Sequence, residues 1–279
     1  MHGEFLKNFV PVKLVSDGNG RLCQWLNTTN KKFTEPFFDD TIRICKNLPE
    51  NRHSFKSASV LQMLPLWSAE MKFIDPTAFI FHVSRCGSTL LSQLLALDPK
   101  NIVLSEVPFL DEVMRLPFNP NRLSVEESDN YFREALRFYG QQRDQDESSL
   151  FVKLDSWHLL FYDRLRKLYP KTPFIILYRS PADIIRSQKR SRGMQSVPGL
   201  IEKEVFGFTE TDLTTDLDLY MSRVLEKYYS EILRITTTDE NFLLVNYDQG
   251  ILSIIKRCLS RLGITPEPGY LKKMEARME

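Results

Sequence analysis

The stretch Phe79-Ile80-Phe81-His82-Val83-Ser84-Arg85-Cys86-Gly87-Ser88-Thr89-Leu90-Leu91 decides the fold class of this chain. Its apolar run stops at small residues and restarts with helix-forming ones, which predicts a strand, a loop and a helix. Such a loop presents backbone N–H groups at a helix N-terminus, where the macrodipole favours negative charge. We therefore expect it to bind phosphate, with hydroxyls from Ser88 and Thr89 and a cation from Arg85. In the alternative interpretation, Gly87 only permits a tight turn and Ser88 only caps the helix.

The loop differs from the phosphate loop of common ATPases and kinases. It lacks the Gly-x-x-x-x-Gly-Lys-Ser/Thr pattern, and no Gly-Lys pair occurs anywhere in the sequence. These observations argue against an ordinary nucleotide hydrolase or kinase.

A second strand followed directly by a helix is predicted at Phe174-Ile175-Ile176-Leu177-Tyr178-Arg179-Ser180-Pro181-Ala182-Asp183-Ile184-Ile185-Arg186-Ser187. Ser180 suits the N-cap and Pro181 the first helical position. Arg179 would stand at the end of the strand, and Ser187 would lie about 10 Å further along the helix axis. A long ligand could be held at both places.

The two stretches together resemble two motifs of the sulfotransferases. Arg85-Cys86-Gly87-Ser88-Thr89 resembles their 5′-phosphosulfate loop, and Tyr178-Arg179-Ser180-Pro181-Ala182-Asp183 with Ser187 resembles their 3′-phosphate motif. The resemblance covers about residues 77–262. It implies 3′-phosphoadenosine 5′-phosphosulfate as the donor, an acceptor hydroxyl or amine, and adenosine 3′,5′-bisphosphate as the product. The residues implied to bind the donor are Arg85, Cys86, Gly87, Ser88, Thr89, Leu90, Arg179 and Ser187.

The details of the motifs look closer to the tyrosylprotein, carbohydrate and bacterial branches than to the cytosolic steroid and phenol enzymes. In those branches a Glu near the end of the second strand is the general base, and Glu106 stands in the matching place. Lys153 resembles the Lys that faces the sulfuryl group, so the implied catalytic residues are Glu106, Arg85 and Lys153. The alternatives are a helix-start carboxylate at Glu106 and an ion pair between Lys153 and Asp155 or another local carboxylate. The nearby His158 could instead resemble the base of the cytosolic branch, but that branch has its His two residues after the Lys, where this chain has Asp155. We therefore expect His158 to begin a helix.

Composition agrees with one soluble enzyme. The 279 residues are 42% hydrophobic, and 37 basic against 36 acidic side chains give a net charge of +1, so bulk charge does not suggest nucleic-acid binding. The basic run Arg186, Lys189, Arg190 and Arg192 could assist the nucleotide or simply form a solvated helix end. Metal-ligand spacings are absent from the sequence, and we expect no metal.

Cysteine usage and hydropathy bear on the compartment. The four cysteines, at positions 23, 45, 86 and 258, have no framework spacing, which favours reduced thiols. The first ten residues do not resemble a signal peptide, and no run approaches the length of a membrane span. The sequence therefore favours a cytoplasmic enzyme of bacterial type.

The order of the predicted elements indicates an α/β fold of the P-loop type, a three-layer arrangement in which helices cover both faces of a parallel sheet. Residues 75–279 would form this domain and residues 1–74 an N-terminal appendage without a functional interpretation. Residues 193–211 could be a lid over the acceptor. Strands are expected at 101–105, 150–154, 174–178 and 241–246 and helices at 124–140, 157–168, 181–192 and 212–235, besides the strand and helix of the first stretch.

Two rival functions from other classes remain open. One is a P-loop kinase or nucleotide hydrolase, which would need a metal carboxylate and the missing lysine. The other is a noncatalytic nucleotide-binding or interaction protein, in which Glu106 would be dispensable.

Overall fold

The structure is a computed structural model that describes residues 5–16, 20–53, 55–119 and 122–278. Residues 1–4, on which part of the signal-peptide expectation rests, lie outside the described residues. The chain divides into two compact units. The first comprises residues 1–77, 92–117 and 121–152, and the second comprises residues 78–91, 118–120 and 153–279. The domain boundary expected after residue 74 stays a prediction.

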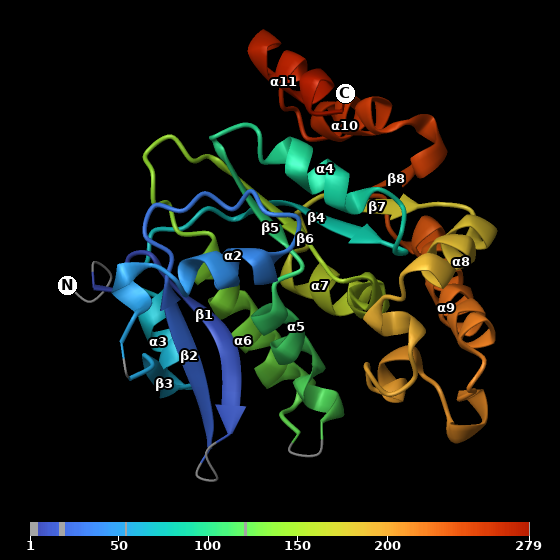
Figure 1. The fold of residues 1–279 in the computed structure, drawn as a ribbon, viewed down its shortest axis with the longest axis horizontal. Helices are drawn as coiled ribbons and strands as arrows, with labels where there is room; N and C mark the ends of the chain where they lie inside the picture. The colour runs from blue at the N-terminus through green and yellow to red at the C-terminus, as the bar shows by residue number, and fades with distance from the viewer. Residues whose placement is uncertain (1–4, 17–19, 54, 120–121, 279) are drawn as a thin grey trace. The chain divides into compact units, whose positions relative to one another are not determined.

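The main sheet confirms the predicted α/β class. In the described part of the chain it has five parallel strands in the order β5-β6-β4-β7-β8, and helices flank it (Figure 1). The strands are β4 (Pro76–His82), β5 (Asn101–Ser105), β6 (Ser149–Lys153), β7 (Phe174–Tyr178) and β8 (Phe242–Asn246).

The second unit aligns three strand ends that the site needs. Strands β4, β7 and β8 pair in parallel, with His82 opposite Leu177 and Tyr178 opposite Asn246. Their residues are near-continuous apolar runs, and Phe79, Ile80 and Phe81 are fully buried, as in a sheet covered on both faces. The residues that follow these strands therefore emerge at one edge of the sheet.

Short helices and one long one complete the second unit. Asp216 is the N-cap residue of the long helix α9, and its side chain accepts from two backbone N–H groups of the first turn. The elements are α4 (Ser88–Leu95, shared with the first unit), η3 (Ser156–Phe161), α7 (Tyr162–Leu168), α8 (Pro181–Arg190), η4 (Met194–Ser196), η5 (Lys203–Phe206), η6 (Glu210–Asp212), α9 (Leu217–Thr238), η7 (Tyr247–Gln249), α10 (Ile251–Arg261) and α11 (Pro268–Met278).

The first unit contains structure that the sequence did not predict. Residues before 75 form a three-stranded antiparallel sheet and short helices, and ring contacts such as Phe38 with Tyr139 at 5.3 Å fix them to α6. Helix α6 begins with a capping box between Ser124 and Glu127. The elements are β1 (Phe9–Ser16), β2 (Arg21–Asn27), α2 (Phe38–Cys45), η1 (Pro49–Asn51), β3 (Ala58–Val60), α3 (Met63–Ser68), α5 (Pro108–Arg115), η2 (Leu116–Phe118) and α6 (Val125–Tyr139), with β5 and β6.

Candidate active site

The β4–α4 loop, residues 83–87, turns sharply between the central strand and its helix. Ser84, Arg85 and Gly87 have positive φ angles of 70°, 51° and 79°. The N–H of Leu91 donates to the carbonyl of Gly87 at 3.0 Å, so the helical hydrogen bonds begin at this glycine. The first turn of α4 thus carries N–H groups without intrahelical acceptors, which is the geometry that binds anions.

Tyr247 explains why position 87 is a glycine. A Cβ atom at Gly87 would lie 2.8 Å from two ring carbons of Tyr247, and the φ of 79° also disfavours any side chain. Tyr247 follows β8 directly. The preceding Asn246 is the N-cap residue of η7, and its side chain accepts from the N–H of Asp248 at 3.1 Å.

Arg179 follows β7 and reaches the same loop. Its Nη1 donates to the carbonyl of Arg85 at 3.3 Å, and its guanidinium lies 4.5 Å from the centre of the Tyr247 ring. Its Nε is buried and has no hydrogen-bond partner among the described residues, since the Asp183 carboxylate is 4.0 Å away. A buried charged donor without an acceptor is costly. An anionic ligand accepting from this nitrogen would remove that cost.

Arg85 and Ser187 complete the predicted donor-binding set. The Arg85 side chain is exposed and one of its Nη atoms donates to the carbonyl of Ser191. Ser187 is half-buried within α8. Ser180 is the N-cap residue of α8 as predicted, but its side chain makes no capping hydrogen bond.

Lys153 ends β6 and is almost fully buried, with 1% of its surface exposed. Its Nζ donates to the hydroxyl of Thr89 at 3.2 Å. Nearby negative charge stabilises an ammonium group that is buried this deeply, because desolvation penalises an isolated charge. Burial raises the pKa of the Cys86 thiol to about 12, although a backbone hydrogen bond with Val83 and the charge of Lys153 lower it. Cys86 is therefore a neutral packing residue, and all four cysteines are free and buried.

Glu106 lies in the first unit, directly after β5. It is half-buried and has a φ of 52°, which is a strained conformation for a residue with a side chain. Asp39, in the first turn of α2, interacts with it electrostatically. The pKa of Asp39 is raised by burial first, then by the charge of Asp40 and by that of Glu106, while Lys46 opposes the shift.

A scan against family models matches residues 76–253 to the sulfotransferase family. The chain belongs to this family. No curated protein matched the chain closely enough to add to this finding. The match spans both motifs that the sequence comparison identified, so the predicted family is confirmed.

Solved structures resemble this sulfotransferase at low sequence identity. The sulfotransferase STF9 from Mycobacterium avium is 14% identical, with a TM-score of 0.51 over 76% of this chain and 69% of that one. The sulfotransferase domain of the curacin biosynthetic pathway is 18% identical, with a TM-score of 0.49 over 72% and 77%. Mouse SULT7A1, complexed with PAP, is 13% identical, with a TM-score of 0.41 over 78% and 69%. The likeness to STF9 supports the fold.

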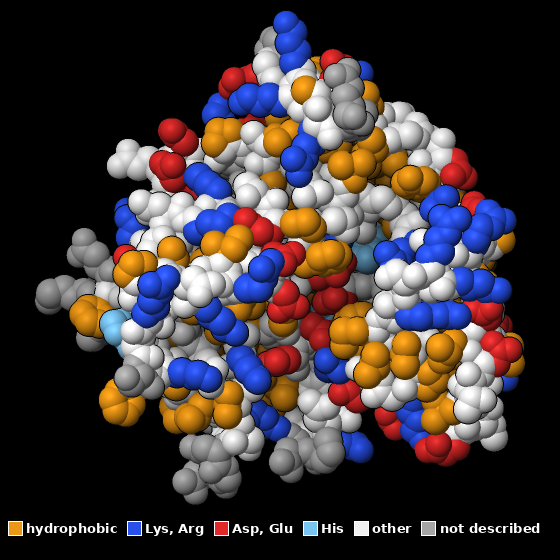
Figure 2. Space-filling view, viewed as in Figure 1, with side chains coloured by type: hydrophobic (Ala, Val, Ile, Leu, Met, Phe, Trp, Pro, Cys, Tyr) orange, Lys and Arg blue, Asp and Glu red, His pale blue; other side chains and the backbone are white. Residues whose placement is uncertain are grey.

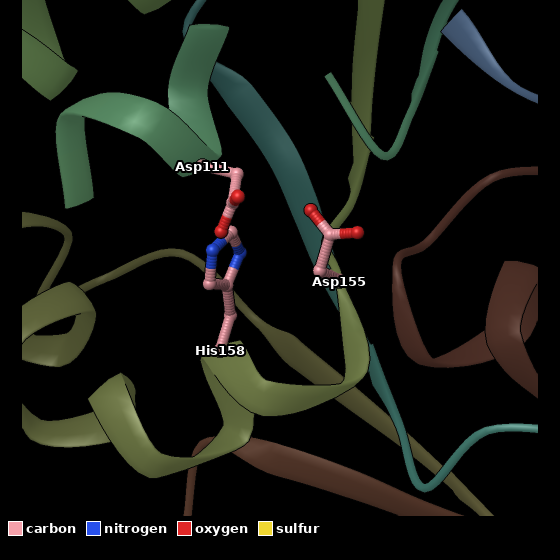
Figure 3. A group of neighbouring side chains, drawn as sticks. All are labelled: Asp111, Asp155 and His158. Atoms are coloured by element: carbon pink, nitrogen blue, oxygen red, sulfur yellow. The ribbon is translucent and has the colours of Figure 1, made fainter. Parts of the chain in front are cut away.

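Asp155 and His158 follow Lys153 in the chain of this sulfotransferase, and Figure 3 draws both side chains. Asp155 is the N-cap residue of η3, and the N–H of His158 donates to its carbonyl at 3.1 Å. The expected helix start at His158 is thus a 3₁₀ turn. Asp111, also labelled, belongs to the first unit, where it pairs with Arg115 at 2.8 Å.

The basic run covers α8 and, with Arg192, the segment just after it, and Lys and Arg side chains gather over this helix in the space-filling view (Figure 2). Arg186 pairs with Asp183 at 2.8 Å, and both Lys189 and Arg192 pair with Asp218, at 2.8 and 2.6 Å. Local carboxylates therefore already compensate three of the four cations, which favours the interpretation of a solvated helix end.

The sequence pattern does not predict four of the residues described in this structure. They are Asp39, which interacts with Glu106 in the first unit, and Tyr247, Gln188 and Gln195 in the second unit. Only Tyr247 had a local signal, because it follows a predicted strand whose parallel pairing would bring it to the loop.

Among the described residues, no helix combines the length and apolar character that a membrane crossing needs.

Proposed function

We propose that this sulfotransferase transfers a sulfuryl group from 3′-phosphoadenosine 5′-phosphosulfate to a hydroxyl or amine of an acceptor. The observation that carries the proposal is the orphaned Nε of Arg179, held beside the β4–α4 loop. This arrangement supplies a buried cationic donor and a helix N-terminus within one unit, which suits a nucleotide with phosphate groups at two positions.

The residues would divide the work as follows. Ser88, Thr89 and the N–H groups of the loop bind the 5′-phosphosulfate, together with Arg85, Cys86, Gly87 and Leu90. Arg179 and Ser187 bind the 3′-phosphate. Lys153, already hydrogen-bonded to Thr89, stabilises negative charge on the transferring group and on the bridging oxygen. This is catalysis by positioning and charge, as in phosphoryl transfer.

Glu106 is proposed as the general base. The acceptor oxygen or nitrogen attacks sulfur in line, and the bond from sulfur to the 5′-phosphate oxygen breaks. The acceptor proton passes to the Glu106 carboxylate, and adenosine 3′,5′-bisphosphate leaves. The strained φ of 52° supports a functional role, because such strain persists mainly where the conformation is needed.

Calorimetric titration of the full chain tests the donor proposal. Adenosine 3′,5′-bisphosphate is titrated in one series and magnesium with ATP in another. We expect micromolar binding of the bisphosphate that weakens about 10-fold to 100-fold in Arg179→Ala, since hydrogen bonds to charged groups contribute about 1.5–3 kcal/mol. Arg43→Ala, at an Arg side chain that is 75% exposed on α2, is the control and should bind normally. A preference for magnesium with ATP would overturn the proposal in favour of a kinase or hydrolase.

A second experiment separates an enzyme from a nucleotide-binding protein. Glu106→Gln should bind the bisphosphate like the natural chain but lose about 100-fold or more of its turnover with an acceptor found by screening labelled donor. Full turnover in this variant would remove Glu106 from the mechanism.

A further inference from the structure

Ser84 and Arg85 adopt left-handed backbone conformations in succession, with φ of 70° and 51°. Neither is a glycine, so the backbone is strained at both positions. Such conformations persist only when surrounding contacts over-determine them. Arg85 is fixed by the bonds already described, from its side chain to Ser191 and from Arg179 to its carbonyl.

Two buried glutamines fix Ser84. Gln188 Nε2 donates to the Ser84 hydroxyl oxygen at 3.1 Å and Gln195 Nε2 donates to it at 2.8 Å. Gln188 is fully buried and Gln195 is 4% exposed. The N–H of Gly193 donates to Gln188 Oε1 at 2.8 Å. Because a backbone N–H can only donate, it sets the orientation of the Gln188 amide and so directs Nε2 to Ser84.

The network continues through the end of β4. The N–H of Ser84 donates to His82 Nδ1 at 3.1 Å, and His82 Nε2 lies 2.9 Å from the carbonyl oxygen of Leu154. A carbonyl can only accept, so Nε2 carries the proton and Nδ1 accepts from the N–H of Ser84. The hydrogen bonds therefore join the residue after Lys153 to the loop, to α8 and to the η4 turn.

We propose that Gln188 and Gln195 are positioning residues that hold Ser84 and Arg85 in the conformation in which the β4–α4 loop binds the donor. The inference rests on the proposed function for the identity of the donor. Gln195 belongs to η4, within the segment 193–211. Ordering of this segment and binding of the nucleotide are therefore coupled. An ordered segment raises the affinity for the nucleotide, and by linkage the bound nucleotide makes the segment more ordered.

The alternative is that the glutamines only fill and stabilise the interior. Both roles lower stability when the hydrogen bonds are lost, so stability alone does not separate them. They differ in two ways. If the glutamines position the loop, the losses of nucleotide affinity caused by substituting Gln195 and Ser84 are not additive. Bound nucleotide also slows amide hydrogen exchange in η4.

The test is a double-mutant cycle on the full chain with Gln195→Met and Ser84→Ala. Methionine keeps the length and volume of glutamine without its amide. We expect each single variant to bind adenosine 3′,5′-bisphosphate about 10-fold more weakly in calorimetry, and the double variant to bind no more weakly than either. Ser84→Ala removes the acceptor from the other side, and it keeps the proposal testable if Gln195→Met fails to fold.

Ser196→Ala is the matched control. It removes a 2.7 Å hydrogen bond from a fully buried hydroxyl to the Gly193 carbonyl in the same turn without touching Ser84. Its nucleotide affinity should be unchanged. In hydrogen exchange, the bisphosphate should protect residues 194–196 in the natural chain and in Ser196→Ala but not in Gln195→Met.

The outcomes separate this inference from the function it rests on. If the natural chain binds no bisphosphate, both are overturned. If it binds but the single variants bind equally well, or their effects add in the double variant, the positioning role is overturned while the donor assignment stands.

Discussion

Arg179 Nη1 donates to the carbonyl of Arg85 at 3.3 Å. Strands β4 and β7 are parallel neighbours, and this hydrogen bond joins the residue that follows β7 to the loop that follows β4. The two predicted motifs, 94 residues apart in the chain, are therefore one structural feature. Because the guanidinium also lies over Tyr247, all three strand ends of the second unit contribute to it.

Arg179→Lys should weaken binding of adenosine 3′,5′-bisphosphate by about 10-fold or more. Lysine keeps the charge but not the planar fork, so it cannot reach the Arg85 carbonyl and present the Nε donor at once. Calorimetry measures the affinity, and Arg43→Lys on the exposed face of α2 is the control. Equal affinity in Arg179→Lys would mean that charge alone suffices there.

Glu106→Gly should lower the free energy of unfolding by less than about 1 kcal/mol, the usual cost of a glycine in a regular element. A glycine accepts the φ of 52° without steric cost, which offsets the added freedom of the unfolded chain. Urea denaturation measures the change. Glu126→Gly, at an exposed position in the first turn of α6, should lose about 1 kcal/mol. A similar loss at position 106 would show that no strain is stored there.

Gly87→Ala should destabilise the protein by about 2 kcal/mol or more and weaken nucleotide binding. The added Cβ would lie 2.8 Å from carbons of the Tyr247 ring, and the alanine would also have to adopt the left-handed φ of Gly87. Gly199→Ala separates the two causes, since Gly199 has a φ of 85° but no atom within 4 Å of the added Cβ. It should cost about 1 kcal/mol. Equal losses at both positions would contradict the clash with Tyr247.

Alkaline pH should destabilise the protein through its buried thiols. Burial raises the pKa of Cys258 from 9.0 to about 12, so the thiol ionises first in the unfolded chain. Its stabilising contribution is complete below pH 9 and is lost as the pH rises towards 12, at up to about 1.4 kcal/mol per pH unit. Denaturation between pH 8 and 11 should show a shallower decline in Cys258→Ala. Identical slopes would mean that the thiol is accessible to water when folded.

Strand and helix positions in the sulfotransferase core were predictable because their signals are local. The strands at 101–105 and 174–178 were predicted to the residue, and the long helix begins at 217 rather than 212, where Asp216 provides the cap. Ser180 and Pro181 predicted the N-terminus of α8 correctly, because a serine N-cap followed by a proline is typical of a helix start.

The first 74 residues gave no such signal. Strand β1 does not alternate strictly between buried and exposed positions, because the register of its pairing with β2 shifts between Pro11 and Lys13. A shift of this kind breaks the two-residue period on which strand prediction depends. The antiparallel sheet was therefore missed.

The candidate site was predicted where residues follow strands and missed where they meet across the chain. Arg85, Arg179 and Lys153 follow or end apolar runs, so their place at the sheet edge could be inferred. Gln195 lies 111 residues from Ser84, and no periodicity relates them. The segment 193–211 contains two 3₁₀ turns and most of a third, which ends at Asp212, and its role as a lid stays a prediction.

The pairing of β4 with β7 has a consequence for biosynthesis. The second unit takes residues 78–91 from the early part of the chain and almost everything else from residue 153 onward. When the ribosome has made the β4–α4 loop, neither the strand beside it nor Arg179 and Tyr247 yet exist. The loop is thus among the first parts of the unit to be translated and among the last to acquire its shape. Contacts between residues far apart in the sequence form late, because closing the long intervening loop costs conformational entropy.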